Sequence, residues 1–262
     1  MILYAPQNPV AFNILGFDVR WYGLIMTCAI FVGIFLGYQI IKRKFSQNEA
    51  NIFIDIAPYV VILSIIGARL FYVIGAFGYY MEHPLDIIML NHGGLSLWGS
   101  VLFGILSIYF ISIKYKFNFL KYLDVFSLVM PLCQSIGRWG NFINQEAYGK
   151  PTNSFIMLFV EPKYRQGNLM DVEYYHPAFL YESILDFCLF LILFFVFLKF
   201  KDLKYGYMTS FYLVSYGSIR LITESIRQDS ILNVFNMPIA TILSIVCIIF
   251  GICLFFNSKF NH

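Results

Sequence analysis

Long apolar stretches alternate with short polar segments along the 262-residue chain. A membrane-spanning helix requires about 20 predominantly apolar residues, and the stretches that meet this requirement lie at 20–41, 54–78, 93–113, 122–143, 178–198, 206–224 and 238–256. The second, fourth and sixth are less apolar than the rest, because they contain Arg69, Arg138 and Arg220 respectively. The pattern predicts an all-α integral membrane protein with seven transmembrane helices, in a single domain of residues 1–262.

The charges of the connecting loops predict how these helices are oriented. Basic residues cluster after the first, third and fifth spans, and one more follows the seventh: Lys42, Arg43, Lys44, Lys114, Lys116, Lys121, Lys199, Lys201, Lys204 and Lys259. Cytoplasmic loops of membrane proteins carry an excess of Lys and Arg. We therefore expect the N-terminus outside and the C-terminus in the cytoplasm. The longest polar insertion, 144–177, then lies outside, and it is long enough only for a small head.

Composition supports a membrane location and argues against several other classes of protein. Hydrophobic residues make up 59% of the chain and charged residues only 13%, about half the charged share of a soluble domain. An aromatic content of 19% argues against disorder. The net charge of +3 is small and the basic residues form no single patch, which argues against nucleic-acid binding. The five cysteines include no CxxC pair, so we expect no metal site and no cofactor.

The segment at the outer end of the fourth span combines an arginine with two amides and a carboxylate. Residues 137–146 read GRWGNFINQE. An arginine within a membrane span is costly unless it is paired or hydrated, and Asn141, Asn144 and Glu146 offer hydrogen-bond partners. The forked guanidinium matches phosphate oxygens, which favours a phosphate-binding site around Arg138. The alternative is an arginine that snorkels to the interface and anchors the helix end.

A histidine precedes two glycines at the outer start of the third span. Residues 91–99 read NHGGLSLWG. Glycine lets the backbone approach a ligand closely, and a neutral imidazole can accept a proton at physiological pH. His92 is therefore a candidate general base. The alternative is an interfacial histidine that caps a helix beside a glycine turn.

Four chemically active residues of the sixth span share one helical face. Tyr216, Arg220, Glu224 and Arg227 follow each other at helical spacing. One interpretation is a structural salt bridge in which Glu224 holds both arginines. The other is a second cationic group directed at an anionic lipid head.

The mouths of the first and fifth spans carry two more polar segments. RWYG at 20–23 includes Tyr22 and is also typical of an interfacial aromatic belt. HPAFLYE at 176–182 places Glu182 close to the membrane, where a carboxylate requires a partner.

The order and spacing of these segments resemble the prolipoprotein diacylglyceryl transferases of bacterial membranes. The resemblance covers nearly the whole chain. It is carried by RWYG at 20–23, HGGLS at 92–96, GRWGNFINQEAYG at 137–149, HPAFLYE at 176–182 and YGSIR at 216–220. The third of these is close to the family signature and highly specific. Two departures are visible: Gln145 stands where the signature usually has a small residue, and Phe179 stands where the family has Gln.

The resemblance implies a lipid-modifying enzyme of the bacterial inner membrane. Such enzymes transfer the diacylglyceryl group from phosphatidylglycerol to the lipobox cysteine of a prolipoprotein that still carries its signal peptide. A thioether forms and glycerol phosphate leaves, which is the first step of lipoprotein maturation. The resemblance also implies a seven-helix body in the lipid bilayer, a short N-terminal arm, a small extracytoplasmic head and an active site near the outer face.

The positions that match the family motifs give the expected site. The expected catalytic residues are His92, Arg138, Tyr216 and Arg220, and the expected substrate-binding residues are Arg138, Tyr22, Asn141, Asn144, Glu146, Gly149, Glu224 and Arg227. We expect Arg138 and Arg220 to bind the phosphate. His92 is expected to take the proton of the thiol, or alternatively to bind the glycerol head, while Tyr22 and Tyr216 orient the groups around it.

Two other kinds of membrane protein also place arginines in apolar spans. One is a transporter or channel for an anionic solute, and the other is a structural or assembly protein that uses the charges to pair helices. The chain shows no internal repeat of the kind that marks many transporters. Its polar groups also concentrate in the outer half of the predicted spans, which favours the enzyme.

Overall fold

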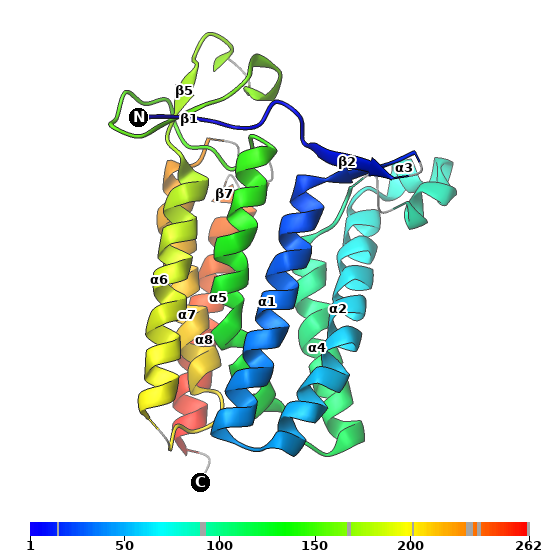
Figure 1. The fold of residues 1–262 in the computed structure, drawn as a ribbon, viewed down its shortest axis with the longest axis vertical. Coiled ribbons are helices and arrows are strands. Elements are labelled where there is room, and N and C mark those ends of the chain that lie inside the picture. Colours follow the sequence, from blue (N-terminus) through cyan, green and yellow to red (C-terminus); the bar gives the residue numbers. More distant parts are fainter. Residues whose placement is uncertain are drawn as a thin grey trace. The chain divides into compact units, whose positions relative to one another are not determined.

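The computed structural model describes residues 1–14, 16–89, 93–166, 169–200, 202–228, 233–234 and 237–260. The helices are α1 (Trp21–Lys44), α2 (Gln47–Gly75), α3 (Phe77–Glu82), α4 (Leu97–Tyr115), α5 (Phe119–Ile143), α6 (Ala178–Lys199), α7 (Tyr207–Ile226) and α8 (Ile239–Phe260), with short 3-10 helices η1 (Pro84–Ile88) and η3 (Pro162–Tyr164) (Figure 1). The strands are β1 (Ile2–Tyr4), β2 (Val10–Ile14), β3 (Phe17–Arg20), β4 (Met157–Phe159), β5 (Tyr174–Tyr175), β6 (Asn233–Val234) and β7 (Met237–Pro238).

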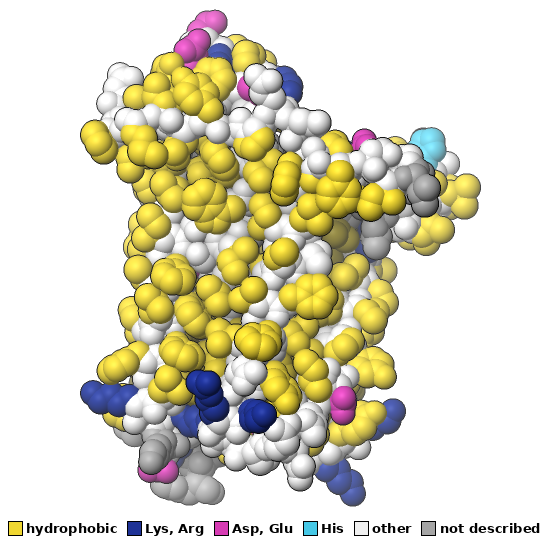
Figure 2. All heavy atoms as spheres, in the orientation of Figure 1, with side chains coloured by type: hydrophobic (Ala, Val, Ile, Leu, Met, Phe, Trp, Pro, Cys, Tyr) yellow, Lys and Arg dark blue, Asp and Glu magenta, His cyan; other side chains and the backbone are white. Residues whose placement is uncertain are grey.

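Six of the described helices are long and apolar enough to cross a membrane. They are α1, α2, α4, α5, α6 and α8. Hydrophobic side chains dominate the face shown in Figure 2, as expected of a surface in contact with lipid. The prediction of a mostly helical membrane protein is confirmed. The predicted span 206–224 is also helical, as α7, but it does not belong to the six because tyrosine, serine, threonine and charged residues interrupt it.

The helix bounds lie within four residues of the predicted spans except at the start of α2. This helix begins at Gln47, whereas hydropathy predicted a start at 54. Its first turns are polar, and Ser46 caps them by accepting a hydrogen bond from the Glu49 backbone N–H at 3.2 Å. Serine is a preferred N-cap residue because its hydroxyl satisfies a helix N–H that has no partner within the helix.

The expected N-terminal arm contains strands. β2 and β3 form an antiparallel hairpin, and β1 pairs in parallel with β4, which lies far along the chain. The apolar pattern predicted helices alone. Strands this short are specified by their pairing partners rather than by local propensity, and so the sequence pattern did not reveal them.

The chain divides into two compact units, of which the first contains residues 1–36 and 126–262. In this unit α7 packs against both α6 and α8 (Figure 1). Ser183 of α6 contacts α5 by donating to the Ser135 backbone oxygen at 2.9 Å. The first half of α1 meets α5 at Gly33, where an added Cβ would lie 2.6 Å from Cys133 Sγ.

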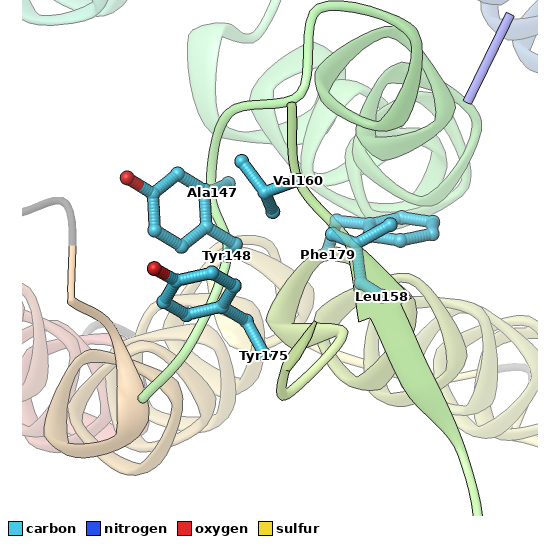
Figure 3. Close-up of a cluster of buried hydrophobic side chains, with 6 residues drawn as sticks. All are labelled: Ala147, Tyr148, Leu158, Val160, Tyr175 and Phe179. Carbon is cyan, nitrogen blue, oxygen red and sulfur yellow. The ribbon is translucent and has the colours of Figure 1, made fainter. Parts of the chain in front are cut away.

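The insertion between α5 and α6 has a small core of its own. β4 is the central strand of a three-stranded sheet with β1 and β5. The buried side chains around the sheet are Ala147, Tyr148, Leu158, Val160, Tyr175 and Phe179 (Figure 3). The ring centroids of Tyr148 and Tyr175 lie 4.9 Å apart. We call residues 144–177 the head. Its core holds the chain in a fixed conformation directly after the predicted signature segment.

The second unit contains residues 37–125, and in it α2 packs against α4. At one end of these helices, Lys121 pairs with Glu49, and the Tyr122 hydroxyl donates to the Glu49 backbone oxygen at 3.1 Å. Near the other end, Arg69 of α2 holds the polypeptide that connects to α4.

Candidate active site

Arg138 lies near the end of α5 and is held from two directions. Its Nη2 donates to Oε1 of Glu182 on α6. Its Nη1 donates to Oδ1 of Asn141, one turn along α5, at 3.3 Å. The side chain is 16% exposed, so most of the guanidinium is removed from solvent. A cation in this environment requires a carboxylate partner, and Glu182 provides it.

Arg220 lies on α7 and shares the same carboxylate. Its Nη1 donates to Oε2 of Glu182 at 3.1 Å, and its Nη2 pairs with Oε2 of Glu224 at 2.7 Å. The Glu182 side chain is only 1% exposed. Each of its two oxygens therefore accepts from a different arginine, and this single carboxylate joins α5, α6 and α7.

Arg138 and Arg220, which we call the arginine pair, still have N–H donors free for further hydrogen bonds after these contacts are made. Within the described part of the chain, the Nε–H groups of Arg138 and Arg220 have no acceptor. The Arg220 side chain is 14% exposed. Glu224 therefore forms the salt bridge with Arg220 that one of the two interpretations predicted. N–H donors nevertheless remain on the guanidinium groups of Arg138 and Arg220. Donors placed this close together suit an anion with several oxygens, such as a phosphate.

The end of α5 forms a turn in which Glu146 folds back onto the helix. Asn141 Nδ2 and Asn144 Nδ2 both donate to Glu146 Oε1, at 2.8 and 3.3 Å. The Glu146 backbone N–H also donates to the Asn141 carbonyl at 3.0 Å. The structure thus brings together the three polar residues predicted around Arg138. Asn141 connects them, because it accepts from the arginine and donates to Glu146.

The structure explains how Gln145 is accommodated where the family pattern usually has a small residue. Its backbone is left-handed, with φ of 53°, a conformation that glycine adopts most easily. Its buried side chain accepts from the Glu161 backbone N–H at 2.7 Å and donates to Glu161 Oε1 at 3.2 Å. Lys163 donates to the same carboxylate, which lowers the pKa of Glu161 and keeps it an ionised acceptor. Gln145 therefore fixes the first residues of the head, directly after α5, against Glu161.

Gly149 and Arg227 meet where the head contacts the end of α7. The two residues form an isolated β-bridge. The Gly149 N–H donates to the His176 carbonyl at 2.7 Å, and an added Cβ on Gly149 would lie 2.7 Å from the His176 Cβ. Close packing against His176 therefore leaves no room for a side chain at Gly149. Substrate binding by Gly149 and Arg227 remains a prediction.

The two predicted tyrosines lie on different helices of the first unit. Tyr22, in the first turn of α1, packs against α5, where a Cβ added to Gly140 would lie 2.6 Å from its ring. It interacts electrostatically with Arg138 and Glu146. Tyr216, on α7, stacks on Tyr212 with ring centroids 5.6 Å apart. Both tyrosines therefore belong to the surroundings of the arginine pair.

His92 lies outside the described residues, and the chain on both sides of it is held by Arg69. Arg69 is 7% exposed. Its guanidinium donates to the carbonyls of Asp86, Ile87, Met89, Gly93 and Gly94. Gly93 and Gly94 have φ of 81° and 78°, which favour glycine. The sequence marked Arg69 only as a charge in an apolar span.

Replacing Arg69 by lysine is expected to loosen the 86–94 segment. Lysine keeps the charge but lacks the forked donors, so several carbonyls lose their partner, at about 1–3 kcal/mol for each buried one. Hydrogen exchange of the backbone amides on either side of His92 should speed up, and the free energy of unfolding should fall. Arg43→Lys, at the exposed end of α1, is the matched control. Unchanged exchange in Arg69→Lys would contradict the assigned role.

Comparison with known proteins identifies the family. The sequence model of the prolipoprotein diacylglyceryl transferases matches residues 9–257. The chain belongs to this family. Relatives named phosphatidylglycerol–prolipoprotein diacylglyceryl transferase are 38% identical in Finegoldia magna, over 95% of this chain and 94% of the relative, and 39% identical in Clostridium botulinum, over 96% and 97%. One from Streptococcus agalactiae is 34% identical, over 94% and 93%.

Membership of the prolipoprotein diacylglyceryl transferase family confirms the resemblance stated from the motifs. It argues against a transporter or channel for an anionic solute. Of the residues that now form the site, sequence reasoning missed Glu182 as a site residue. The signal was present, because a carboxylate at the mouth of an apolar span requires a partner, but the sequence did not indicate that its partners are Arg138 and Arg220.

Proposed function

We propose that this chain transfers the diacylglyceryl group of phosphatidylglycerol to the lipobox cysteine of prolipoproteins, with release of glycerol phosphate. The observation that carries the proposal is the pair of guanidinium groups from α5 and α7 held on the Glu182 carboxylate of α6. Both arginines lie within the span matched by the family. The named relatives support the same reaction.

The arrangement in the membrane belongs to the same proposal. α7 (the predicted span 206–224) also crosses the membrane and brings the number of spans to seven, and its arginine is tolerated there because Glu182 and Glu224 neutralise it. The N-terminus and the head, residues 144–177, lie outside, and the C-terminus lies in the cytoplasm. The distribution of basic residues supports this orientation. The site, at the head-proximal ends of α5 and α6, is then near the outer face of the bacterial inner membrane.

The reaction displaces a phosphate oxygen from a saturated carbon. The thiol of the lipobox cysteine loses its proton to His92, and the sulfur attacks the glycerol carbon of the diacylglyceryl group. The carbon–oxygen bond breaks, and its electron pair stays on the phosphate of the departing glycerol phosphate. Arg138 and Arg220 bind this phosphate and stabilise the negative charge that develops on the leaving oxygen. The loss of one such donor typically raises a barrier by roughly 3 kcal/mol.

The other site residues position the arginines and the lipid in this proposal. Asn141, Asn144 and Glu146 fix the orientation of Arg138 through their hydrogen-bonded chain. Tyr22 and Tyr216 orient the reacting groups beside the arginine pair. Gly149, Glu224 and Arg227 complete the binding surface at the ends of α5 and α7.

A single reaction tests the proposed function. The purified chain is incubated in micelles with phosphatidylglycerol and a lipobox peptide, and the peptide is analysed by mass spectrometry. A transferase makes the peptide heavier by one diacylglyceryl group in a thioether linkage. A peptide with serine in place of cysteine is the control. An unmodified cysteine peptide under conditions in which the protein is folded would refute the proposal.

His92→Gln is expected to lower transfer and to remove part of its pH dependence. Only the neutral imidazole accepts a proton, so wild-type kcat/KM should rise with pH over the range in which a histidine deprotonates. The variant should lack this rise, which steady-state assays across pH will measure. His83→Gln, at an exposed histidine of the same unit, is the control. Near-normal transfer with an unchanged profile would remove His92 as the base.

A further inference from the structure

The three helices that carry Arg138, Glu182 and Arg220 also carry a second polar layer, one helical turn further from the head. Gln134 precedes Arg138 on α5, Asp186 follows Glu182 on α6, and Tyr216 precedes Arg220 on α7, each at a spacing of four residues. Residues at this spacing lie on the same face of a helix. The second layer, which we define as Gln134, Asp186 and Tyr216, therefore faces the same interior as the arginines.

The second layer is rich in hydrogen-bond acceptors that have no donor. Asp186 is 0% exposed, yet neither of its carboxylate oxygens has a hydrogen-bond partner among the described residues. The same is true of Gln134 Oε1, which is buried. Asp186 interacts electrostatically with Arg138 and Arg220, but both arginines are paired with other carboxylates. Buried polar atoms are nearly always paired in native proteins, so these acceptors require a donor that the described chain does not supply.

Asp186 and Gln134 share a neighbour, Tyr212, so their unpaired acceptor oxygens lie in the same part of the interior. Tyr212 interacts with both residues, since it accepts a side-chain hydrogen bond from the Gln134 amide N–H and interacts electrostatically with Asp186. Its ring stacks on Tyr216, which interacts electrostatically with Asp186 as well. The rings of Tyr212 and Tyr216 thus lie beside the second layer, in which the unpaired atoms are the oxygens of Asp186 and Gln134.

The donor lipid of the proposed reaction brings the missing hydrogen-bond donors. The phosphate of phosphatidylglycerol has only acceptors, which suit the arginines, whereas its head glycerol has two hydroxyl groups. An extended glycerol group reaches across about one helical turn, about 5.4 Å. With the phosphate on the arginines, the hydroxyls then reach the second layer.

We infer that Asp186 and Gln134 bind the hydroxyl groups of the lipid head and thereby favour phosphatidylglycerol over lipids whose head has no hydrogen-bond donor. The inference rests on the proposed function and adds the residues that determine donor specificity. A carboxylate accepts two hydrogen bonds side by side, which matches neighbouring hydroxyls. A site built to pair with a hydroxyl discriminates strongly against an analogue that lacks it, because the buried acceptors are then left unpaired.

The test compares two donor lipids that differ only in the head. Phosphatidylglycerol and phosphatidylethanol are each supplied to the full chain in micelles with the lipobox peptide, and kcat/KM is measured for both. Phosphatidylethanol keeps the phosphodiester, and its transfer releases ethyl phosphate, but its head has no hydroxyl. Wild type is expected to prefer phosphatidylglycerol by about 10- to 100-fold, the range for lost hydrogen bonds to a charged acceptor.

Asp186→Leu should bring this ratio close to one, mainly by slowing transfer from phosphatidylglycerol. Asp186→Asn, which keeps the shape and one acceptor, should give an intermediate ratio. Ser183→Ala is the control, because it removes another buried polar group of α6, one that contacts Ser135 and not the arginines. Its ratio should match wild type.

The inference is overturned if wild type uses both lipids equally, or if folded Asp186→Asn retains the full wild-type ratio. It is also overturned if Asp186→Leu slows both lipids by the same factor. Should Asp186→Leu fail to fold, the Asn variant decides. Failure of the proposed function looks different, since wild type would then transfer nothing from phosphatidylglycerol.

Discussion

Replacing Glu182 with glutamine is expected to abolish transfer and to destabilise the association of α5, α6 and α7. Glutamine has one acceptor oxygen, and its amide would direct N–H groups at a guanidinium. Arg138 would lose its carboxylate, while Arg220 would keep only Glu224. Removing one partner of a buried ion pair typically costs about 3–5 kcal/mol. Unfolding of the purified variant in micelles measures the loss of stability, and the lipobox-peptide assay measures the loss of transfer.

The control for this substitution is Glu173→Gln, at an exposed carboxylate of the head. It should leave stability and transfer close to wild type. Glu182→Asp provides a second comparison, because it keeps the charge but shortens the side chain, and should recover part of the stability and little of the activity. A Glu182→Gln protein with wild-type stability would show that the arginines do not depend on this carboxylate.

Arg138→Lys is expected to fold but to lower kcat/KM by about 100-fold or more. Lysine keeps a positive charge beside Glu182, so the pairing that stabilises the helices is largely retained. It cannot present a planar fork to Asn141 and to a phosphate at once, and the loss of a donor to a developing oxyanion costs about 100- to 1,000-fold in rate. Assays with labelled phosphatidylglycerol measure the decrease.

The same substitution at Arg220 allows the two arginines to be compared. If both bind one phosphate, the double variant should lose less than the product of the single losses, because residues that share a partner are not additive. Arg43→Lys is the control at an exposed arginine. Full activity in either single variant, with the protein folded, would remove that arginine from the proposed mechanism.

The spans were predictable because hydrophobic length is a local property of the sequence. The start of α2 was not, because a polar capping turn has no hydropathy signal. The β1–β4 pair was not, because its partners are distant in sequence and three residues long. α7 lies between these cases. Its apolar residues predicted a helix, but its polar face is explained by Glu182, which the fold places beside it and which pairs with Arg220.

The candidate site was predictable where a charge interrupts an apolar run or a motif is specific. Arg138 met both conditions, and Arg220 met the first. Glu182 was recognised as needing a partner, but which cations it joins depends on how three helices pack. Asp186 gave little signal, since an acid within a long apolar helix does not by itself reveal which groups surround it. That its oxygens lack donors is a property of the folded chain alone.

The pairing of β1 with β4 has a consequence for the order in which the protein assembles. Ile2–Tyr4 can find Met157–Phe159 only after the intervening polypeptide, including α1, α2, α4 and α5, has been synthesised. Contacts between such distant segments form late because the loop they close is long. The residues of β1 must therefore remain unpaired until the chain has been synthesised as far as β4.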